Sequence, residues 1–393
     1  MSSVIAEEPQ TELRDITQHE IIALRTRYNL ADAHTHQRQS KTQQEIVSQL
    51  PRLWYESEEL TQHELEQRFI HRFFELQGQP TALKLDRALL AYAASIVMFI
   101  ATTFCMQRRL SISLIEPCFD NLHDLIKNLQ VPRIPLHEEL FYDVDKIREN
   151  LENATTGDVL CLVDPNNPTG FTLLQHGRRG FQQVVDFCRD HNKILMLDLS
   201  FVSFVLSEGP LDRFDLYEML EESGITYIVM EDTGKVWPVQ DAKCAILMTS
   251  EDIYQEVYDI HTSVLLNVSP FILNMLSEYL SDSRSDALAS VKNTLNTNRQ
   301  VAVEALEGSA LEYQKPAAPV SVAWFKITDP NITASKLQEA AYEKQVYVLP
   351  GTYFYWSRPE AGERYVRLAL ARQPEVFAPA VQRLREVVDE LSG

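Results

Sequence analysis

The sequence predicts an α/β protein, with a large domain built on a mostly parallel sheet and a smaller α+β domain after it. Two observations carry this prediction. Five apolar runs recur between residues 111 and 250 with helix-like segments between several of them, which is typical of a sheet covered on both faces. After about residue 286 the chain changes to long polar helices and short strands. We therefore expect an N-terminal segment over 1–50, a large domain over 51–285 and a small domain over 286–393.

Composition narrows the class of protein. The chain has 393 residues, 45% of them apolar, and only 12 glycines, which fits a globular protein with a large core. The formal net charge of −20 argues against nucleic acid as the main partner, because a phosphate backbone is held by clustered Lys and Arg. Neither G-x-G-x-x-G nor G-x-x-x-x-G-K-[ST] occurs, so dinucleotide-binding and phosphate-loop classes lose their main support.

The N-terminal segment divides into a helix and a polar turn. Residues 17–29 (TQHEIIALRTRYN) indicate an amphipathic helix, and Thr17 and Glu20 have the spacing of a capping box with Thr17 as N-cap. The following stretch, ADAHTHQRQS, is polar and turn-like. The start of the chain has no basic cluster followed by an apolar run, so we expect no signal peptide and a cytoplasmic protein.

The large domain contains the longest apolar stretch, residues 88–104. Ala, Ser and Thr dilute this stretch and charged residues bracket it, so we expect a helix buried in the core and no membrane partner. The five cysteines are widely spaced without a C-x-x-C pair. We expect them to be reduced core residues, with neither a metal site nor a disulfide framework.

The apolar runs of the large domain predict its strands. They cover residues 111–117, 159–165, 194–200, 226–232 and 244–250. The first four end in polar clusters, at 116–119, 164–170, 198–200 and 232–235. Because ligands of open α/β sheets bind in the crevice outside the carboxyl ends of the strands, we expect these clusters to share one site.

The small domain is predicted from its helices and strands. A long polar helix covers 286–308, strands cover 320–327, 345–351 and 364–371, and a closing helix covers 375–391. No internal repeat and no low-complexity linker separates it from the large domain.

Three polar clusters together indicate one chemistry. DPNNPTG (164–170) predicts a rigid turn after a strand, with the side-chain amides of Asn166 and Asn167 in the crevice. Asp198 follows at the next strand end, and Lys235 at the one after. A lysine, a carboxylate and an amide at neighbouring strand ends match a pyridoxal 5'-phosphate site. The lysine binds the aldehyde, the carboxylate keeps the pyridine nitrogen protonated, and the amide donates to the ring hydroxyl.

With these residues the sequence resembles the class I/II (fold type I) pyridoxal-phosphate aminotransferases. The resemblance covers roughly residues 85–375 and rests on NNPTG at 166–170, Asp198, Lys235, Lys243 and Arg367. It implies that Asn167 contacts the ring hydroxyl, Asp198 the pyridine nitrogen, Lys235 the aldehyde carbon, and Arg367 the α-carboxylate of the substrate.

The resemblance also implies further cofactor contacts and an assembly. Phe119 falls where the family stacks an aromatic ring on the cofactor, and Ala94 and Ser95 fall at the helix start that holds the phosphate. A homodimer with cofactor sites near the interface is implied as well.

Three positions depart from the family pattern. Phe201 stands where a Tyr is usual, Asp232 where a Ser is usual, and Lys243 where an Arg is usual. A carboxylate near the cofactor phosphate is repulsive unless it turns toward a cation. We therefore expect Asp232 to face a basic substrate.

A narrower family fits these departures. The sequence is similar to the pyridoxal-phosphate-dependent arginine oxidases and hydroxylases, which use molecular oxygen to oxidise L-arginine. The shared positions are Thr17, Glu20, Asp32, His34, Asp198, Ser200, Asp232 and Lys235. The resemblance implies that the N-terminal segment forms a lid over the substrate and that Ser200 belongs to the catalytic group. It also implies that Thr17, Glu20, Asp32 and Asp232 surround the guanidinium and that His34 transfers a proton.

Alternatives stay open beside this interpretation. An ordinary aminotransferase or lyase for a basic amino acid needs no oxygen, and a non-catalytic relative keeps only the fold. His34 as a solvated side chain, Phe119 as a core aromatic and Asp232 as the partner of a neighbouring lysine are structural explanations of the same residues. We expect oxidation of L-arginine to a 2-oxo acid, with C4 hydroxylation or chain desaturation, releasing ammonia and hydrogen peroxide.

Overall fold

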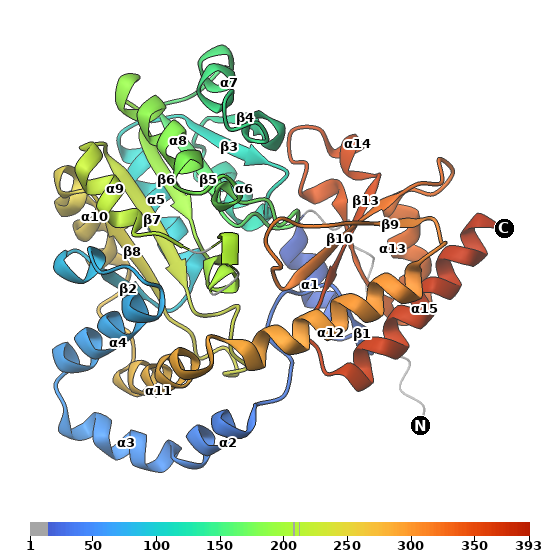
Figure 1. Cartoon of the computed structure of the whole chain (residues 1–393), viewed down its shortest axis with the longest axis horizontal. Helices are drawn as coiled ribbons and strands as arrows, with labels where there is room; N and C mark the ends of the chain where they lie inside the picture. Colours follow the sequence, from blue (N-terminus) through green and yellow to red (C-terminus); the bar gives the residue numbers. More distant parts are fainter. Residues whose placement is uncertain (1–14, 207–208, 212) are drawn as a thin grey trace, which may run out of the picture.

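A computed structural model describes residues 15–206, 209–211 and 213–393. It has two lobes, one around a seven-stranded sheet and one around a four-stranded sheet, with helix α1 between them (Figure 1). The large sheet has the order β2-β8-β7-β6-β5-β3-β4. The strands are Leu89–Ala91, Ala245–Thr249, Tyr227–Asp232, Ile194–Asp198, Val159–Val163, Ile112–Glu116 and Arg133–His137 in that order.

The large sheet is mostly parallel, as predicted. Strands β3 to β7 pair in parallel, whereas β8 is antiparallel to both of its neighbours, β7 and β2. All five predicted strands are present. The short strands β2 and β4 were missed, because β2 has three residues and β4 contains a proline and mostly half-buried side chains.

Helices cover this sheet. They are α5 (Ala94–Gln107), α6 (Asp120–Asn128), α7 (Ile147–Asn153), α8 (Arg178–Asp190), α9 (Leu216–Ser223) and α10 (Glu251–Val264). Helix α5 packs on α6, α10, β7 and β8, so its apolar residues are buried on several sides, which explains the long apolar stretch. Among the described residues, no helix combines the length and apolar content that a membrane crossing requires.

A second group of helices packs beside the large sheet. Helices α2 (Lys41–Ser48), α3 (Leu50–Glu59) and α4 (Gln62–Leu76) pack with α11 (Pro270–Asp286). The predicted helix over 286–308 starts later, as α12 (Ala289–Leu306), because Ala287 and Leu288 both adopt a left-handed conformation that ends α11. All five cysteines are buried and free.

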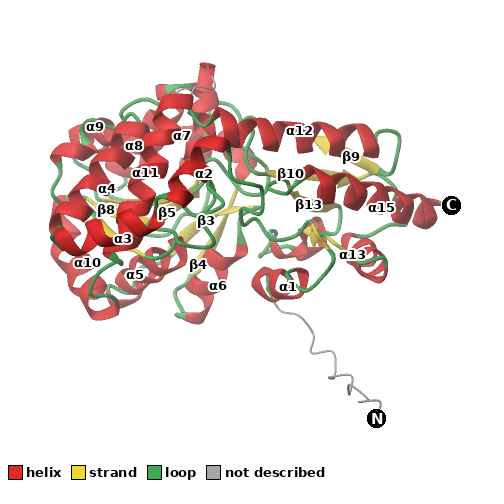
Figure 2. Ribbon diagram, turned by 90° about the horizontal axis from the view of Figure 1, so that it is seen from below, coloured by secondary structure: helices red, strands yellow, loops and turns green. Residues whose placement is uncertain are grey.

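The small lobe is an antiparallel sheet covered by helices. Its strand order is β12-β13-β10-β9, with bounds Leu349–Pro350, Tyr365–Ala369, Val322–Ile327 and Leu311–Gln314. Helix α13 (Ala334–Glu343) and the closing helix α15 (Pro374–Ser392) pack here, and α12 runs along α15 (Figure 2). The short helical elements are α14 (Pro359–Gly362), η1 (Ala82–Lys84), η2 (Glu138–Phe141), η3 (Leu173–His176), η4 (Val202–Val205), η5 (Gly209–Leu211) and η6 (Gly351–Tyr353).

The N-terminal segment is bound to the small lobe. Strand β1 (Tyr28–Asn29) pairs in parallel with β11 (Val346–Tyr347). Helix α1 (Ile16–Ala23) buries Ile16 and Ala23 in a cluster with Tyr347 and Phe354, and its buried His19 contacts Tyr347. The predicted division at residues 50 and 285 stays a prediction, and residues 1–14 of the predicted lid lie outside the described part of the chain.

Candidate active site

A cavity of about 180 Å³ lies at the carboxyl ends of β5, β6 and β7, where the sequence predicted a shared site. Its lining contains most of the predicted site residues: Thr17, Glu20, His34, Ala94, Ser95, Phe119, Asn167, Asp198, Ser200, Asp232, Lys235 and Lys243. Arg367 and Asp32 are not among the lining residues. The structure therefore brings together residues from the N-terminal segment and from five separate parts of the large lobe.

Lys235 follows a glycine against which two side chains of the cavity pack. Strand β7 ends at Asp232, and Thr233 and Gly234 connect it to the lysine. A Cβ on Gly234 would lie 2.6 Å from Cδ of Lys243 and 2.9 Å from Oδ2 of Asp232. A Cβ at this position would require these two side chains to shift, so Gly234 lets Asp232 and Lys243 lie close to the backbone beside Lys235.

Asp232 is a buried carboxylate with spare acceptor capacity. It is 4% exposed, and its Oδ1 has no hydrogen-bond partner in the described part of the chain. Burial raises its pKa, while the charges of Lys235 and Lys243 and the backbone N–H of Gly234 act in the opposite direction. A buried acceptor without a donor is uncommon in a folded protein, so this oxygen is suited to a cationic ligand.

Asp198 ends β6 and carries the second carboxylate of the cavity. Ser200 donates to its Oδ1 from the backbone N–H (3.0 Å) and from the hydroxyl (2.6 Å). Among the described residues, no donor contacts Oδ2. Burial raises the pKa of Asp198 to about 6, with the nearby charge of Asp232 adding to it and Ser200 opposing it. A cation at Oδ2 would relieve this cost, as a protonated pyridine nitrogen does.

The two asparagines of the 164–170 turn point to different places. Asn167 lines the cavity, and its Oδ1 accepts from Nη1 of Arg367 at 3.3 Å, which leaves its amide N–H groups for a ligand. The prediction that Asn166 also points into the crevice is wrong. Its Nδ2 donates to Pro117 O at 2.8 Å and to Oε2 of Glu138 at 2.5 Å, because these buried acceptors lie behind the turn.

Arg367 lies behind the cavity, on β13. Its side chain is fully buried and contacts Asn167, Oε1 of Glu20 at 3.2 Å, and the carbonyl of Ala31. Glu20, predicted to hold a substrate guanidinium, therefore pairs with the arginine predicted to hold a substrate carboxylate. The same contact ties helix α1 to the small lobe.

Asp32 is placed differently from its prediction as a substrate contact. It is fully buried, and it accepts from Nδ1 (2.6 Å) and the backbone N–H (2.7 Å) of His34, Nε2 of His36 (2.9 Å) and Nδ2 of Asn29 (2.7 Å). Arg372 lies 3.3 Å away. Burial alone would raise the pKa of Asp32, but the bonds from His34 and His36 and the charge of Arg372 outweigh it and hold the pKa well below its usual range. These partners use its acceptor capacity, so Asp32 does not reach the cavity.

His34 lines the cavity and is oriented by Asp32. Because Nδ1 donates to a carboxylate, the neutral ring leaves Nε2 as the acceptor. Nε2 lies 3.8 Å from Oδ1 of Asp241. A histidine held in one tautomer beside Lys235 and Asp232 is suited to moving a proton.

The start of α5 is suited to an anion. Its N-cap, Ala93, has no side-chain acceptor, so the backbone N–H groups of the first turn, including those of Ala94 and Ser95, remain available. Lys243 lines the same cavity and forms an ion pair with Asp241 at 3.3 Å. A phosphate group placed there would meet a helix N-terminus, a hydroxyl and an ammonium group.

Helix α1 presents two different faces. Thr17 and Glu20 line the cavity, whereas Ile16, His19 and Ala23 pack on the small lobe. Nδ1 of His19 is 2.7 Å from the hydroxyl of Tyr347. The predicted capping box is wrong, because the N-cap is Asp15, two residues before Thr17, and it accepts from the backbone N–H of Gln18 at 2.7 Å.

Sequence reasoning missed four lining residues: Ala93, Met98, Asn121 and Val163. Met98 lies one turn after Ala94 on the same helix, and Asn121 lies two residues after Phe119, so spacing from the predicted residues was the available signal. Oδ1 of Asn121 is buried and has no hydrogen-bond partner among the described residues.

The cavity receives a lysine, a carboxylate and an amide from the ends of neighbouring strands. This arrangement is the one found in fold type I pyridoxal-phosphate enzymes. Residues 30–384 match the model of the aminotransferase class I and II family, and the chain belongs to that family.

Two curated relatives are aminotransferases. An aspartate aminotransferase of Pyrococcus horikoshii is 24% identical over 261 residues, which cover 65% of this chain and 63% of the relative. An aromatic-amino-acid aminotransferase of Thermococcus litoralis is 23% identical over 263 residues, covering 65% and 64%. The chain thus spans a little under two thirds of the length of these relatives.

Solved structures share the whole fold. A structure of MppP soaked with the product 2-ketoarginine is 31% identical, covers 92% of this chain and 99% of its own, and has a TM-score of 0.82. A double mutant of the Thermus thermophilus aspartate aminotransferase is 15% identical, with coverage of 96% and 97% and a TM-score of 0.73. The second likeness shows the fold alone.

The residues present fit pyridoxal 5'-phosphate, the cofactor of this family. Asp198 has a free oxygen for the pyridine nitrogen, the start of α5 has free N–H groups for the phosphate, and Lys235 stands at a strand end beside them. When bound, the cofactor supplies an electron sink for negative charge that develops at the substrate α-carbon.

Proposed function

We propose that this protein oxidises L-arginine with molecular oxygen. L-arginine, oxygen and water give the 2-oxo acid, ammonia and hydrogen peroxide. Desaturation of the chain or hydroxylation at C4 is a further two-electron oxidation, which consumes a second molecule of oxygen and releases a second hydrogen peroxide, with water as the source of the hydroxyl group. The observation that carries the proposal is the buried Asp232, whose Oδ1 has no partner among the described residues and which lines the cavity with Lys235. A guanidinium offers several donors to such a carboxylate, and a charge-assisted bond of this kind contributes about 1.5–3 kcal/mol.

The remaining residues receive roles in this proposal. Lys235 binds the cofactor aldehyde and moves the proton at the substrate α-carbon. Asp198, supported by Ser200, pairs with the pyridine nitrogen, and the amide of Asn167 donates to the ring hydroxyl. Phe119 stacks on the ring. The phosphate is held by Ala94, Ser95 and Lys243.

Substrate contacts come from both lobes. Asp232, Glu20 and Thr17 surround the guanidinium, and Arg367 binds the α-carboxylate once Glu20 turns from Arg367 to the substrate. We assign Asp32 the role of orienting His34, in place of a direct substrate contact, because its acceptors are engaged by other residues.

Helix α1 supports the use of oxygen. It lies over the cavity with Thr17 and Glu20 facing inward, so its closure excludes water while oxygen, a small apolar molecule, still enters. His34 holds or delivers a proton from Nε2 during this step. The similarity to MppP, whose structure was soaked with the product 2-ketoarginine, supports the same substrate for this chain.

An aminotransferase or lyase acting on a basic amino acid is the second candidate. It is favoured by the curated relatives, which are aminotransferases. In that reaction the amino group passes to a keto acid and no oxygen is consumed.

Oxygen uptake by the cofactor-loaded protein distinguishes the two candidates. We expect rapid uptake with L-arginine and little with L-lysine or L-ornithine, together with a 2-oxo acid in the mass spectrum. Uptake with none of them, while the cofactor spectrum still changes on adding amino acid, contradicts the oxidase and directs the search to keto-acid acceptors.

We also propose a homodimer. Tyr92, Val264 and Leu266 are exposed apolar residues, Leu266 at 92%, and the Tyr92 hydroxyl accepts from the backbone N–H of Ser269 near the same segment. Leu266→Glu is expected to lower the mass measured by light scattering from two chains to one. An unchanged mass, or a single chain in the parent protein, contradicts this assembly or this interface.

A further inference from the structure

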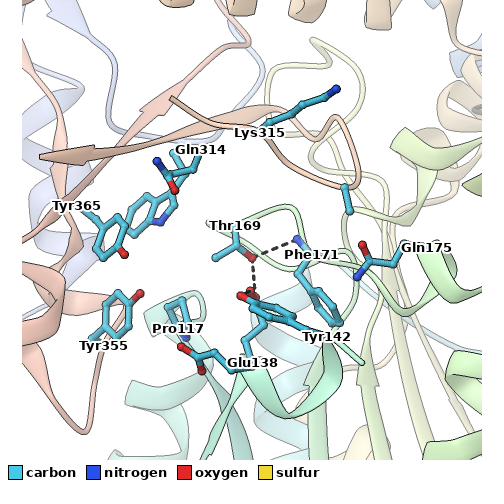
Figure 3. A pocket seen from close by; sticks show the side chains of 13 residues that line it. Pro117, Glu138, Tyr142, Thr169, Phe171, Gln175, Gln314, Lys315, Tyr355 and Tyr365 are labelled. Carbon is cyan, nitrogen blue, oxygen red and sulfur yellow. Dashed lines mark hydrogen bonds between the residues drawn. The ribbon is translucent and has the colours of Figure 1, made fainter. Parts of the chain in front are cut away.

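Glu138 is a buried carboxylate that carries no role in the proposed reaction. It lies in η2, on the wall of a second cavity of about 350 Å³ between the two lobes (Figure 3). Its side chain is 1% exposed, and no cation lies within ion-pair distance of it in the described part of the chain. A carboxylate is costly to bury without a counter-ion, so its hydrogen bonds indicate what it does.

Three donors converge on Glu138. Asn166 donates from Nδ2 to Oε2 at 2.5 Å, Thr169 donates its hydroxyl to Oε2 at 2.6 Å, and Tyr142 donates its hydroxyl to Oε1 at 2.8 Å. Figure 3 shows the contact with Thr169, whose oxygen also accepts from the backbone N–H of Phe171. Burial raises the pKa of Glu138 to about 7, and the three donors oppose this rise.

The two residues that Glu138 holds in the 164–170 turn stand on either side of Asn167 and Pro168. Within the described part of the chain, the side chain of Asn167 has one partner, Arg367, at 3.3 Å, which is long for a hydrogen bond. The direction of its amide is therefore set largely by the backbone of the turn. That backbone is closed by the Asn166 N–H to Phe171 O (2.7 Å) and is fixed from outside by Glu138.

Asn166 also contacts the segment that carries Phe119, the second proposed cofactor contact. Its Nδ2 also donates to Pro117 O at 2.8 Å, and Pro117 precedes Cys118 and Phe119. One amide thus joins the turn that carries Asn167 to the segment that carries Phe119. Because Glu138 is the carboxylate that orients this amide, a change at Glu138 reaches both segments.

We propose that Glu138 is a positioning residue for the cofactor, acting through Asn166 and Thr169 on Asn167 and Phe119. The inference rests on the proposed cofactor contacts of Asn167 and Phe119 and on no property of the substrate. This role differs from a purely stabilising one, because it requires that the environment of the bound cofactor change when Glu138 is altered.

Asp164 offers a matched control in the same turn. It is also buried, and burial raises its pKa to about 7. It accepts from the Thr172 hydroxyl and from the backbone N–H of Leu173 at 2.8 Å, both beyond Gly170 and away from Asn167. Asp164→Asn therefore disturbs the turn without loosening the two residues that flank Asn167.

The experiment compares Glu138→Gln with Asp164→Asn, and with Asn167→Ala as reference. The readouts are the dissociation constant of pyridoxal 5'-phosphate, the visible band of the bound cofactor across pH, and the Tm of cofactor-free protein. In Glu138→Gln a single neutral amide oxygen remains for the Asn166 and Thr169 donors, and their bonds lose the charge of the carboxylate, so we expect cofactor affinity to fall about tenfold, as for loss of one hydrogen bond. The pH at which the band changes should shift in the direction seen in Asn167→Ala. Asp164→Asn should move Tm and leave the band unchanged.

The inference is wrong if Glu138→Gln binds cofactor as the parent does with an unshifted band, or if Asp164→Asn shifts the band equally. Should Glu138→Gln fail to fold, Thr169→Val removes one donor and keeps the carboxylate. A smaller shift in the same direction is then expected, and no shift overturns the inference. None of these readouts uses arginine or oxygen, so failure here is separate from failure of the proposed oxidation.

Discussion

Two regions meet at the cavity and are held in different ways. The strand-end cradle, formed by Asn167, Asp198 and Lys235, is carried by strands β5, β6 and β7 in the middle of the large sheet. Residues 15–37 of the N-terminal segment are held by a two-residue strand, one short helix and polar contacts with the small lobe, and by bonds from Thr35 and Gln37 to carbonyl groups of the large lobe. The difference indicates that the cofactor contacts belong to the core of a sheet, whereas Thr17 and Glu20, two of the residues proposed to select the substrate, lie on a segment that detaches at a lower cost in free energy.

The largest expected effect is on covalent cofactor binding, and it distinguishes the two lysines of the cavity. Lys235→Ala should abolish the covalent bond to the cofactor and its visible band, and lower activity by roughly 10³-fold or more, since the proposed proton transfer is lost as well. Lys243→Ala should keep the band and weaken cofactor binding. Spectra of the two purified variants test this. A retained band in Lys235→Ala contradicts the assignment of the cradle.

The second-largest expected effect is on stability, whose dependence on pH has opposite signs in the two regions. Burial raises the folded-state pKa of Asp198 to about 6 and lowers that of His19 to about 4. Between about pH 4 and 6 the folded state then binds more protons at Asp198 than the unfolded state, so stability from this group is lost as pH rises. At His19 the unfolded state binds more protons between about 4 and 6.5, so stability from this group is lost as pH falls.

Urea unfolding of cofactor-free protein from pH 4 to 7.5 measures these slopes. Asp198→Asn should remove a fall in unfolding free energy of up to about 3 kcal/mol on the way to pH 6. Proteolysis of the N-terminal segment should speed up as pH falls from about 6.5 to about 4 in the parent protein and lose this pH dependence in His19→Phe. Identical slopes in Asp198→Asn and the parent would contradict the effect assigned to the cradle.

A smaller effect concerns Asp232, which borders both regions. Asp232→Asn removes the charge that faces the proposed guanidinium, so KM for L-arginine should rise about 10- to 100-fold, equivalent to 1.5–3 kcal/mol. Cofactor content, measured by absorbance after dialysis, should change little. Loss of cofactor before loss of arginine binding would show that Asp232 faces the phosphate.

The smallest expected effect tests how the N-terminal segment is held on the small lobe. His19→Ala removes the contact with Tyr347, worth about 1 kcal/mol, so KM should rise about fivefold while the Tm of the whole protein stays within a few degrees. Ile21→Ala, at an exposed position on the same helix, is the control and should leave KM unchanged. Equal effects of the two substitutions would mean that the buried face of α1 does not hold the segment.

The cradle was more predictable from the sequence than the N-terminal segment. Apolar runs locate strands, and the carboxyl ends of parallel strands meet by topology, so Asn167, Asp198 and Lys235 were brought together without knowledge of side-chain directions. The two asparagines show the limit of this reasoning. Only the position of Glu138, on another strand connection, decides that Asn166 turns away while Asn167 faces the cavity.

The N-terminal segment was harder because its partners are distant in sequence. Asp32 was expected at the substrate, but Arg372 and two histidines surround it, and Glu20 pairs with Arg367. Such pairs are set by tertiary docking, which local spacing does not encode. The capping box failed for a related reason, since Thr17 faces the cavity and Asp15 supplies the cap.

The pairing of β1 with β11 has a consequence for how the protein is made. The N-terminal segment leaves the ribosome long before its partners, because Tyr28 pairs with Val346, Glu20 with Arg367 and Asp32 with Arg372. At ordinary rates of synthesis this delay is on the order of tens of seconds. The cradle, complete by residue 235, is therefore translated long before the N-terminal segment can dock on the small lobe. Residues 15–37 thus complete the active site after the cradle has been made.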